Sequence, residues 1–174
     1  MTDNVLLQTF IEKLPRSRSV TRVERLEDDL AVLYAALPVG TPRLPHLYEQ
    51  LILSWAWHRG AAFDHELTVS IPDHQYPLLY TLLGNAVGKA AFGPLLREMQ
   101  HDPALWNALV AARFIPFGQG GYQSYDPICF DLNRVRSNDC PVVGIDHEAI
   151  HCSDRVRIAG EIAPSFRDLV VKTQ

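Results

Sequence analysis

The sequence has few cysteines, no long apolar run and no excess of basic residues. Its three cysteines, Cys129, Cys140 and Cys152, form no Cys-x-x-Cys pair and leave an odd one over. They therefore predict neither a disulfide framework nor a thiolate zinc site, and a reduced, cytoplasmic setting is the simpler interpretation. No apolar stretch approaches the roughly 18 residues of a transmembrane helix, and no signal-peptide pattern opens the chain. We expect a protein that is neither membrane-inserted nor exported.

The charge and the length of the chain set further limits. Lys and Arg total 16 against 20 Asp and Glu, which gives a formal net charge of −4, and the sign varies little along the sequence. This balance argues against a nucleic-acid-binding face that depends on bulk charge. The 174 residues, 47% of them hydrophobic, suffice for one core. Because no linker or repeat divides the chain, we expect a single domain over residues 1–174.

The first 113 residues are predicted to be mostly helical. A strict alternation of apolar and polar residues predicts one strand near residues 63–71, which Pro72 ends. Asp102-Pro103 marks a clear helix start, because Asp can cap free amides and Pro suits the first helical position. Apolar residues recur at helical spacing in four stretches, so the predicted helices lie within residues 6–14, 23–37, 44–60 and 76–110.

The last third of the chain turns to strands. Four short apolar or alternating segments begin near Phe114, Ile128, Val142 and Val156, with tight connections between them. They predict an antiparallel meander, and therefore an α+β fold with helices in front and strands behind. Ser165 and Asp168 have capping-box spacing and predict a final helix.

One short string has the pattern of a zinc enzyme. His147-Glu148-Ala149-Ile150-His151 satisfies His-Glu-x-x-His, in which a helix aligns two zinc ligands and a glutamate that activates water. However, the preceding Val142-Val143-Gly144-Ile145 favours a strand, and a new alternating strand is expected soon after Ser153-Asp154. A helix between these two strands would have barely two turns. The downstream carboxylate that could complete the site, Glu161, is expected on a loop. We favour a polar loop at a strand end, with no metal or cofactor, and keep the zinc-dependent hydrolase as the alternative.

A series of short motifs in one order carries a family resemblance. It comprises Pro116-Phe117-Gly118, an aromatic and acidic turn at 122–126, Cys129-Phe130-Asp131-Leu132, a Pro-Val-Val strand that ends in Asp146-His147-Glu148, and Ile162-Ala163-Pro164-Ser165-Phe166. Residues 114–171 thereby resemble the C-terminal half of the SUKH superfamily, which includes the fungal cell-wall-synthesis regulators of the Smi/Knr type and many bacterial proteins. The resemblance implies a strongly bent antiparallel sheet with helices packed around it, and a strand that ends at 146–148.

The resemblance also implies a function. Bacterial members act mainly as immunity proteins that bind and neutralise a cognate toxin, often a nuclease, by occlusion rather than catalysis. We therefore expect a non-enzymatic protein-binding domain whose partner is a toxin domain, with no direct contact to nucleic acid or membrane. A regulatory scaffold, like the fungal members, is the other non-enzymatic alternative. An acidic and aromatic face would suit a basic active site. The candidate contact residues, each of which could instead be an ordinary turn or strand-end residue, are Tyr122, Tyr125, Asp126, Asp131, Asp146 and Glu148.

Overall fold

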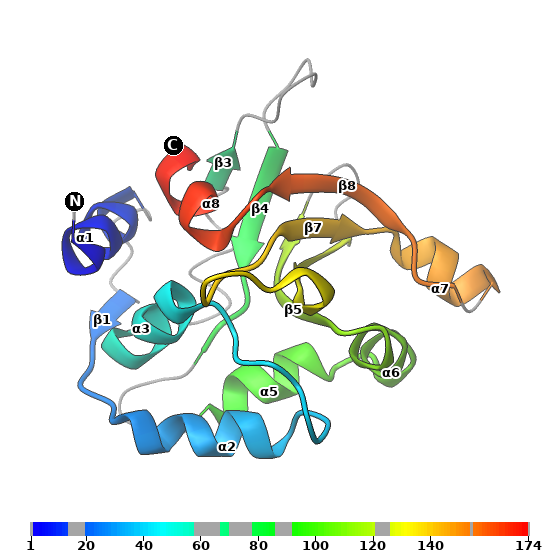
Figure 1. The fold of residues 1–174 in the computed structure, drawn as a ribbon, viewed down its shortest axis with the longest axis horizontal. Helices are drawn as coiled ribbons and strands as arrows, with labels where there is room; N and C mark the ends of the chain where they lie inside the picture. The colour runs from blue at the N-terminus through cyan, green and yellow to red at the C-terminus, as the bar shows by residue number, and fades with distance from the viewer. Residues whose placement is uncertain are drawn as a thin grey trace.

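The structure is a computed structural model with helices packed on a twisted antiparallel sheet (Figure 1). It describes residues 2–13, 20–57, 67–69, 78–85, 92–120, 126–153 and 155–173. The helices are α1 (Asp3–Lys13), α2 (Leu30–Ala35), α3 (His46–Ser54), α5 (Gly93–Met99), α6 (Pro103–Ala111), α7 (His147–Ser153) and α8 (Phe166–Lys172), with short 3-10 turns η1 (Glu27–Asp29) and η2 (Leu132–Arg134). Among the described residues, no helix has the length and apolar character to span a membrane.

Six strands form the main sheet in the order in which they occur in the sequence. They are β3 (Leu67–Val69), β4 (Leu78–Leu82), β5 (Phe114–Gly120), β6 (Pro127–Asp131), β7 (Val142–Ile145) and β8 (Ile158–Ala163). Every neighbouring pair is antiparallel, so the predicted meander and the α+β fold class are confirmed. In Figure 1, β4 runs across the direction of β7 and β8, as expected for a strongly twisted and bent sheet.

Several predicted elements agree with the structure and others shift. The first helix and the Asp102 cap of α6 are confirmed, with Leu105 N donating to Asp102 Oδ1 at 3.0 Å. The predicted strand near 63–71 appears as β3, and its flanking residues lie outside the described ranges. The last strand begins at Ile158, two residues after the predicted start at Val156, and continues to Ala163. Glu161 therefore lies in a strand, so its prediction as a loop residue is wrong.

Two segments predicted as helical are strands. Residues 78–82 form β4 within the stretch predicted as helical from 76 to 110, and β2 (Trp55–Trp57) pairs with β1 (Val20–Arg22) where the third helix was expected to continue. Both are short, nearly continuous apolar runs, which fit a buried strand as well as a helix. Tertiary contacts determine that both runs are strands. Strand β4 pairs with β3 and β5 on either side, and Trp57 Nε1 of β2 donates to Leu83 O at 2.8 Å.

An aromatic cluster occupies the main core. Phe117 and Phe130 stack with ring centroids 4.1 Å apart, and Tyr48 meets Phe130 edge-on at 4.9 Å. Phe166 makes T-shaped contacts with Phe117 at 5.6 Å and with Phe130 at 5.5 Å. All four side chains are fully buried. Because they belong to α3, β5, β6 and α8, this cluster joins the sheet to a helix from the first third of the chain and to the C-terminal helix.

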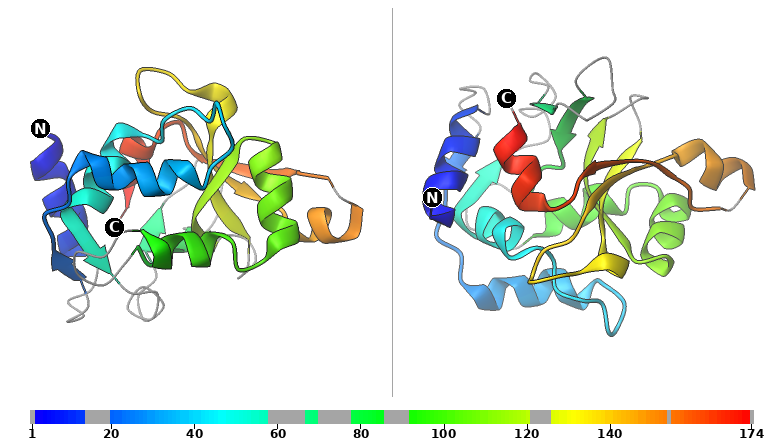
Figure 2. Two further views of the ribbon diagram at one scale, coloured as in Figure 1. Left: turned by 90° about the horizontal axis from the view of Figure 1, so that it is seen from below. Right: turned by 45° about the horizontal axis from the view of Figure 1, so that its top comes forward.

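The other face of the sheet has a smaller core. Phe114, Val143 and Ile145 point toward Leu109 of α6 and Ile150 of α7. Figure 2 shows α6 and α7 lying close to the end of the sheet, away from α8. The main sheet is therefore covered on both faces, and α7 packs at the end where β7 stops.

Candidate functional site

The His-Glu-x-x-His string lies on a helix. Strand β7 ends at Ile145, and α7 begins at His147, so the predicted polar loop and the strand implied through Glu148 are both wrong. Asp146 causes the change, because its Oδ1 accepts a hydrogen bond from Ala149 N at 3.0 Å. This is the N-cap interaction that favours a helix start directly after the strand.

Each histidine of this helix is paired with a carboxylate from another element. His147 Nδ1 lies 2.7 Å from Asp126 Oδ1, which also accepts the backbone N–H of His147 at 3.2 Å. His151 Nε2 lies 3.2 Å from Asp102 Oδ2, at the start of α6. The two imidazole rings are 6.4 Å apart between centroids, with an interplanar angle of 77°. These contacts hold α7 against α6 and the start of β6.

Within the described ranges, α7 has no third ligand of the kind that a catalytic zinc site needs. Such a site needs three protein ligands converging on one point, and in the described part of the chain no three His, Cys, Asp or Glu side chains do so. Glu161, the expected downstream carboxylate, accepts a bond from Arg134 Nη1 at 2.8 Å instead. Carboxylate partners of this kind do orient ligating histidines in metal sites. Here the Asp126 and Asp102 contacts also fix α7 against its neighbouring elements.

The predicted acidic face is not assembled as expected. Tyr122 and Tyr125 lie outside the described residues. Asp126 is only 6% exposed and Asp131 3%, so neither presents its carboxylate to a partner. We correct both to buried structural residues, which charge alone could not show in the sequence.

The two remaining acidic candidates differ from each other. Asp146 caps α7 and forms an ion pair with Arg157, whose hydrogen bond lowers the pKa of the Asp146 carboxyl below its ordinary value. Glu148 is exposed, and its carboxylate has no partner among the described residues. Of the acidic candidates described, Glu148 is thus the one that offers a free negative charge.

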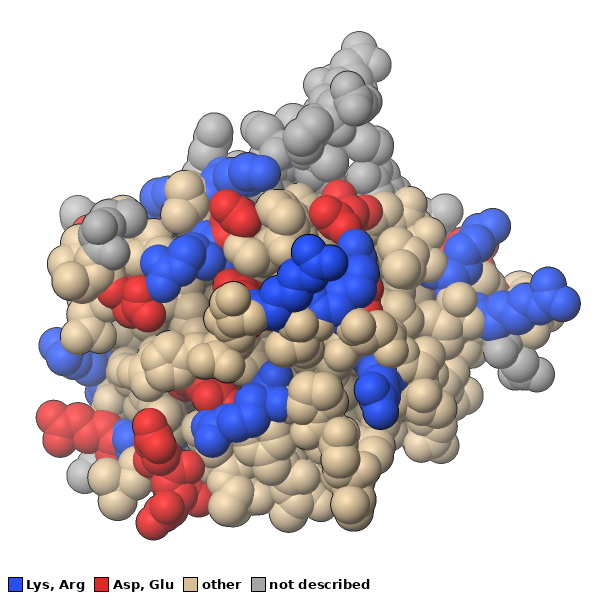
Figure 3. Space-filling model, viewed as in Figure 1, with Lys and Arg blue, Asp and Glu red and all other residues tan. Residues whose placement is uncertain are grey.

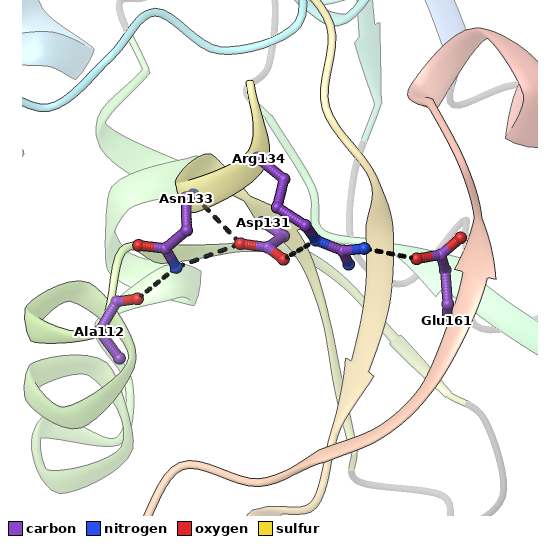
Figure 4. A network of polar contacts seen from close by, with 5 residues as sticks. All are labelled: Ala112, Asp131, Asn133, Arg134 and Glu161. Carbon is purple, nitrogen blue, oxygen red and sulfur yellow. Dashed lines mark hydrogen bonds and ion pairs between the residues drawn. The ribbon is translucent and has the colours of Figure 1, made fainter. Parts of the chain in front are cut away.

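Asp131 is the centre of a polar network (Figure 4). Its Oδ1 accepts from Asn133 N and Nδ2, both at 3.1 Å, and its Oδ2 accepts from Arg134 Nε at 2.6 Å. Arg134 continues to Glu161 on β8, while Asn133 Nδ2 donates to Ala112 O at 2.9 Å. The hydrogen bond to Asp131 is the main cause that raises the pKa of Arg134. The network fixes η2 between the end of α6 and strand β8.

A tight turn follows η2. Arg136 N donates to Asp139 O at 2.8 Å, and Asp139 N donates to Arg136 O at 2.9 Å. The two residues between them have positive φ, 49° at Ser137 and 62° at Asn138. This is the two-residue geometry of a type I′ turn, which usually selects Asn, Asp or Gly. The turn projects Arg136 and Asp139 toward the start of α8.

Asp139 is a structural residue that the sequence interpretation missed. Its Oδ1 accepts from Cys140 N at 2.8 Å and Phe166 N at 2.9 Å, and its Oδ2 accepts from Arg167 N at 3.3 Å. It therefore caps α8 together with Ser165, whose hydroxyl accepts from Asp168 N at 3.0 Å as predicted. The Asn138-Asp139 turn pattern was a usable signal for the turn but not for its partner.

A cleft opens between this turn and the end of β8, with a volume of about 340 Å³. Burial raises the pKa of the Cys140 thiol, which lines it, to about 12, so the cleft holds no thiolate nucleophile at neutral pH. Arg136 is exposed and, in the residues that the structure describes, its guanidinium has no partner. The charged and apolar walls include Arg134, Arg136, Asp139, Pro141, Glu161 and Pro164.

The candidate site is thus a cleft beside a sheet edge, in which Arg136 is an exposed charge without a partner among the described residues. The walls are held by the Asp131 network and by the capped start of α8. Comparisons add no relative: a scan against protein-family models finds no match, and searches of curated proteins and of solved structures find none either. What the site can do therefore has to be argued from its geometry and from the resemblance of residues 114–171.

Proposed function

We propose that the chain is a non-enzymatic protein-binding domain that neutralises a toxin domain by covering its active site. The SUKH resemblance of residues 114–171 supports this proposal, together with an architecture of the kind that the resemblance implies: a bent antiparallel sheet with helices packed around it. The proposal needs a rigid, exposed surface and no reactive group.

The observation that carries the proposal is the commitment of the enzyme-like side chains to internal contacts. His147 and His151 are each paired with an aspartate, and Asp131 is buried within an ion-pair network. Burial raises the pKa of the Cys129 thiol well above its ordinary value, so this cysteine is not a ready nucleophile. Arg134, Arg136 and Glu161 line a cleft, where a protein partner can make polar contacts.

The proposal is tested by recovering the full chain from its own cell and identifying the proteins that copurify. We expect one protein with a toxin domain, whose activity is lost when the chain is added in equimolar amount. A signalling protein in its place would support the regulatory scaffold. Recovery of the chain alone, from cells that produce the partner candidates, would contradict both binding functions.

The helical form of the His-Glu-x-x-His string favours one alternative, a zinc-dependent hydrolase that uses His147, Glu148 and His151. Metal analysis of the purified chain discriminates between the two. The binding proposal expects far less than one zinc per chain in the wild type and in a His147→Ala variant. The hydrolase hypothesis predicts one zinc per chain, which His147→Ala should lose. The control variant His101→Ala should keep it, because His101 is an exposed histidine that contacts Glu98 O.

A further inference from the structure

Strand β8 is an open edge of the main sheet. It is hydrogen-bonded to β7 on one side and is the last strand in the sheet order. No hydrogen bond from the described residues reaches its outer side. Ile158, Ala159 and Glu161 are exposed, with Ile158 44% exposed. Free backbone N–H and C=O groups along such an edge form a template for one more strand.

Unpaired arginines lie near both ends of this edge. Arg136 lines the cleft next to Glu161 and Pro164, at the end of β8, and Arg155 lies three residues before its start. Both are exposed, and within the described ranges neither guanidinium has a partner. Figure 3 shows basic side chains gathered at the centre of the view, over η2 and the turn after it, and again toward the right, near the junction of α7 and β8.

Three of the carboxylates near this edge are already occupied. Asp139 caps α8, Asp146 pairs with Arg157, and Glu161 pairs with Arg134. The accessible unpaired charge at the Arg136 end is therefore positive, whereas at the Arg155 end the exposed Glu148 of α7 directly precedes Ala149, whose carbonyl oxygen accepts from Arg155 N. A partner segment that fits the Arg136 end must carry acidic groups, which is the opposite of the acidic face expected from the sequence.

A second copy of the chain does not fit this edge. Antiparallel pairing of two β8 strands would bring Arg155 toward Arg136 of the other copy, and parallel pairing would bring like arginines together. The pairing of β7 with β8 also shifts register twice, after Val142 and after Gly144. Such irregular edges disfavour regular pairing with an identical edge.

We propose that an extended acidic segment of the protein partner adds to β8 as a further strand, with carboxylates near its ends paired to Arg136 and Arg155. This inference rests on the proposed protein-binding function and names the chemistry of the partner. The six residues of β8 span about 20 Å at roughly 3.3 Å per residue, so a segment of similar length suffices. Ile158 supplies an apolar contact beside the new backbone hydrogen bonds.

The test uses a labelled eight-residue peptide of alternating Glu and Val, with a Gln and Val peptide of the same length as its control. Fluorescence anisotropy with the full chain should show the acidic peptide binding at least about tenfold more tightly, with an affinity that falls as salt rises. Arg136→Glu and Arg155→Glu should each weaken it several-fold. Arg22→Glu, an exposed arginine on β1 in the small sheet, should leave it unchanged.

Amide hydrogen exchange supplies a readout of the backbone. The acidic peptide should slow exchange in residues 158–161, because their outward amides acquire partners. Equal binding of the two peptides, unchanged binding by Arg136→Glu and Arg155→Glu, no binding at all, or protection elsewhere would overturn the proposal. A copurified partner that binds the Arg136→Glu/Arg155→Glu variant as tightly as wild type would also overturn it while leaving the protein-binding function intact. Absence of any protein partner would instead contradict that function.

Discussion

Asp139 stabilises the junction of a turn and a helix through three backbone amides. Its replacement in Asp139→Ala leaves the first amides of α8 without this acceptor, so we expect a loss of about 1–2 kcal/mol in the free energy of unfolding, as for helix caps. Urea unfolding followed by circular dichroism measures it. Asp28→Ala is the control, because this exposed aspartate has no side-chain partner among the described residues. Equal stability of the two variants would contradict the capping role.

Asp146 should make stability depend on acid pH. The Arg157 hydrogen bond lowers its pKa in the folded state, so its contribution is fully present above the unfolded pKa of about 3.9 and is lost as pH falls through the lower folded pKa. The difference in stability between wild type and Asp146→Asn should therefore be constant from pH 7 to 5 and shrink below pH 4. Unfolding measured from pH 7 to 2.5 tests this expectation. Glu148→Gln, at an exposed carboxylate, should not reproduce the loss.

The sequence identified several important acidic residues but assigned them the wrong surroundings. Asp131 was predicted as a partner contact and is buried, but the Asp131-x-x-Arg134 spacing could have predicted its ion pair. The pairing of Asp126 with His147 could not be predicted in this way, because 21 residues separate them and only the sheet brings them together. Charge in a sequence does not distinguish an exposed carboxylate from a buried and compensated one.

At the scale of the elements, the contact between β4 and β5 depends on Gly118. A Cβ added there would lie 2.7 Å from the Thr81 carbonyl oxygen, a backbone atom that cannot move without shifting β4. Gly118→Ala should therefore lower the free energy of unfolding by about 1–3 kcal/mol, as expected for overpacking. Thermal unfolding of the full chain measures the change.

Gly93→Ala is the matched control for that substitution. Its new methyl group would meet Arg97 Nη1 at 3.6 Å, an ordinary contact, and alanine is favoured in α5. We expect unchanged or slightly higher stability. A similar loss in both variants would mean that the effect at Gly118 does not come from the close approach to Thr81.

The elements differ in how far local sequence determines them. The strands β5 to β7 and helix α8 follow from alternation, turns and a capping box, which are signals carried by neighbouring residues. Strand β4 and helix α7 do not. The apolar run of β4 fits a helix as well as a strand, and pairing with its neighbours makes it a strand. Helix α7 forms because Asp146 caps it instead of continuing the strand. Tertiary contacts decide such cases.

At the scale of the molecule, Phe166 joins the C-terminal helix to the sheet. Its ring is fully buried against Phe117, Phe130 and Tyr48. Phe166→Ala should therefore lower the free energy of unfolding by about 3–5 kcal/mol. If the wild-type free energy of unfolding is smaller than this loss, the variant should show no cooperative unfolding. Val171→Ala lies in the same helix at a side chain that is 55% exposed and should change stability by less than about 1 kcal/mol. Near-UV circular dichroism, which reports aromatic packing, and urea unfolding distinguish the two variants.

The strand order of the sheet has a consequence for synthesis on the ribosome. Because each strand of the main sheet pairs with the one made just before it, the meander can grow as the chain emerges, with α5 and α6 made between β4 and β5. Helix α8, however, is made after every strand, and it carries the ring that completes the aromatic cluster. A nascent chain that has formed β8 but not α8 therefore exposes the phenylalanine and tyrosine side chains that α8 covers in the folded protein. At this stage we expect the largest exposed apolar surface for a chaperone to bind.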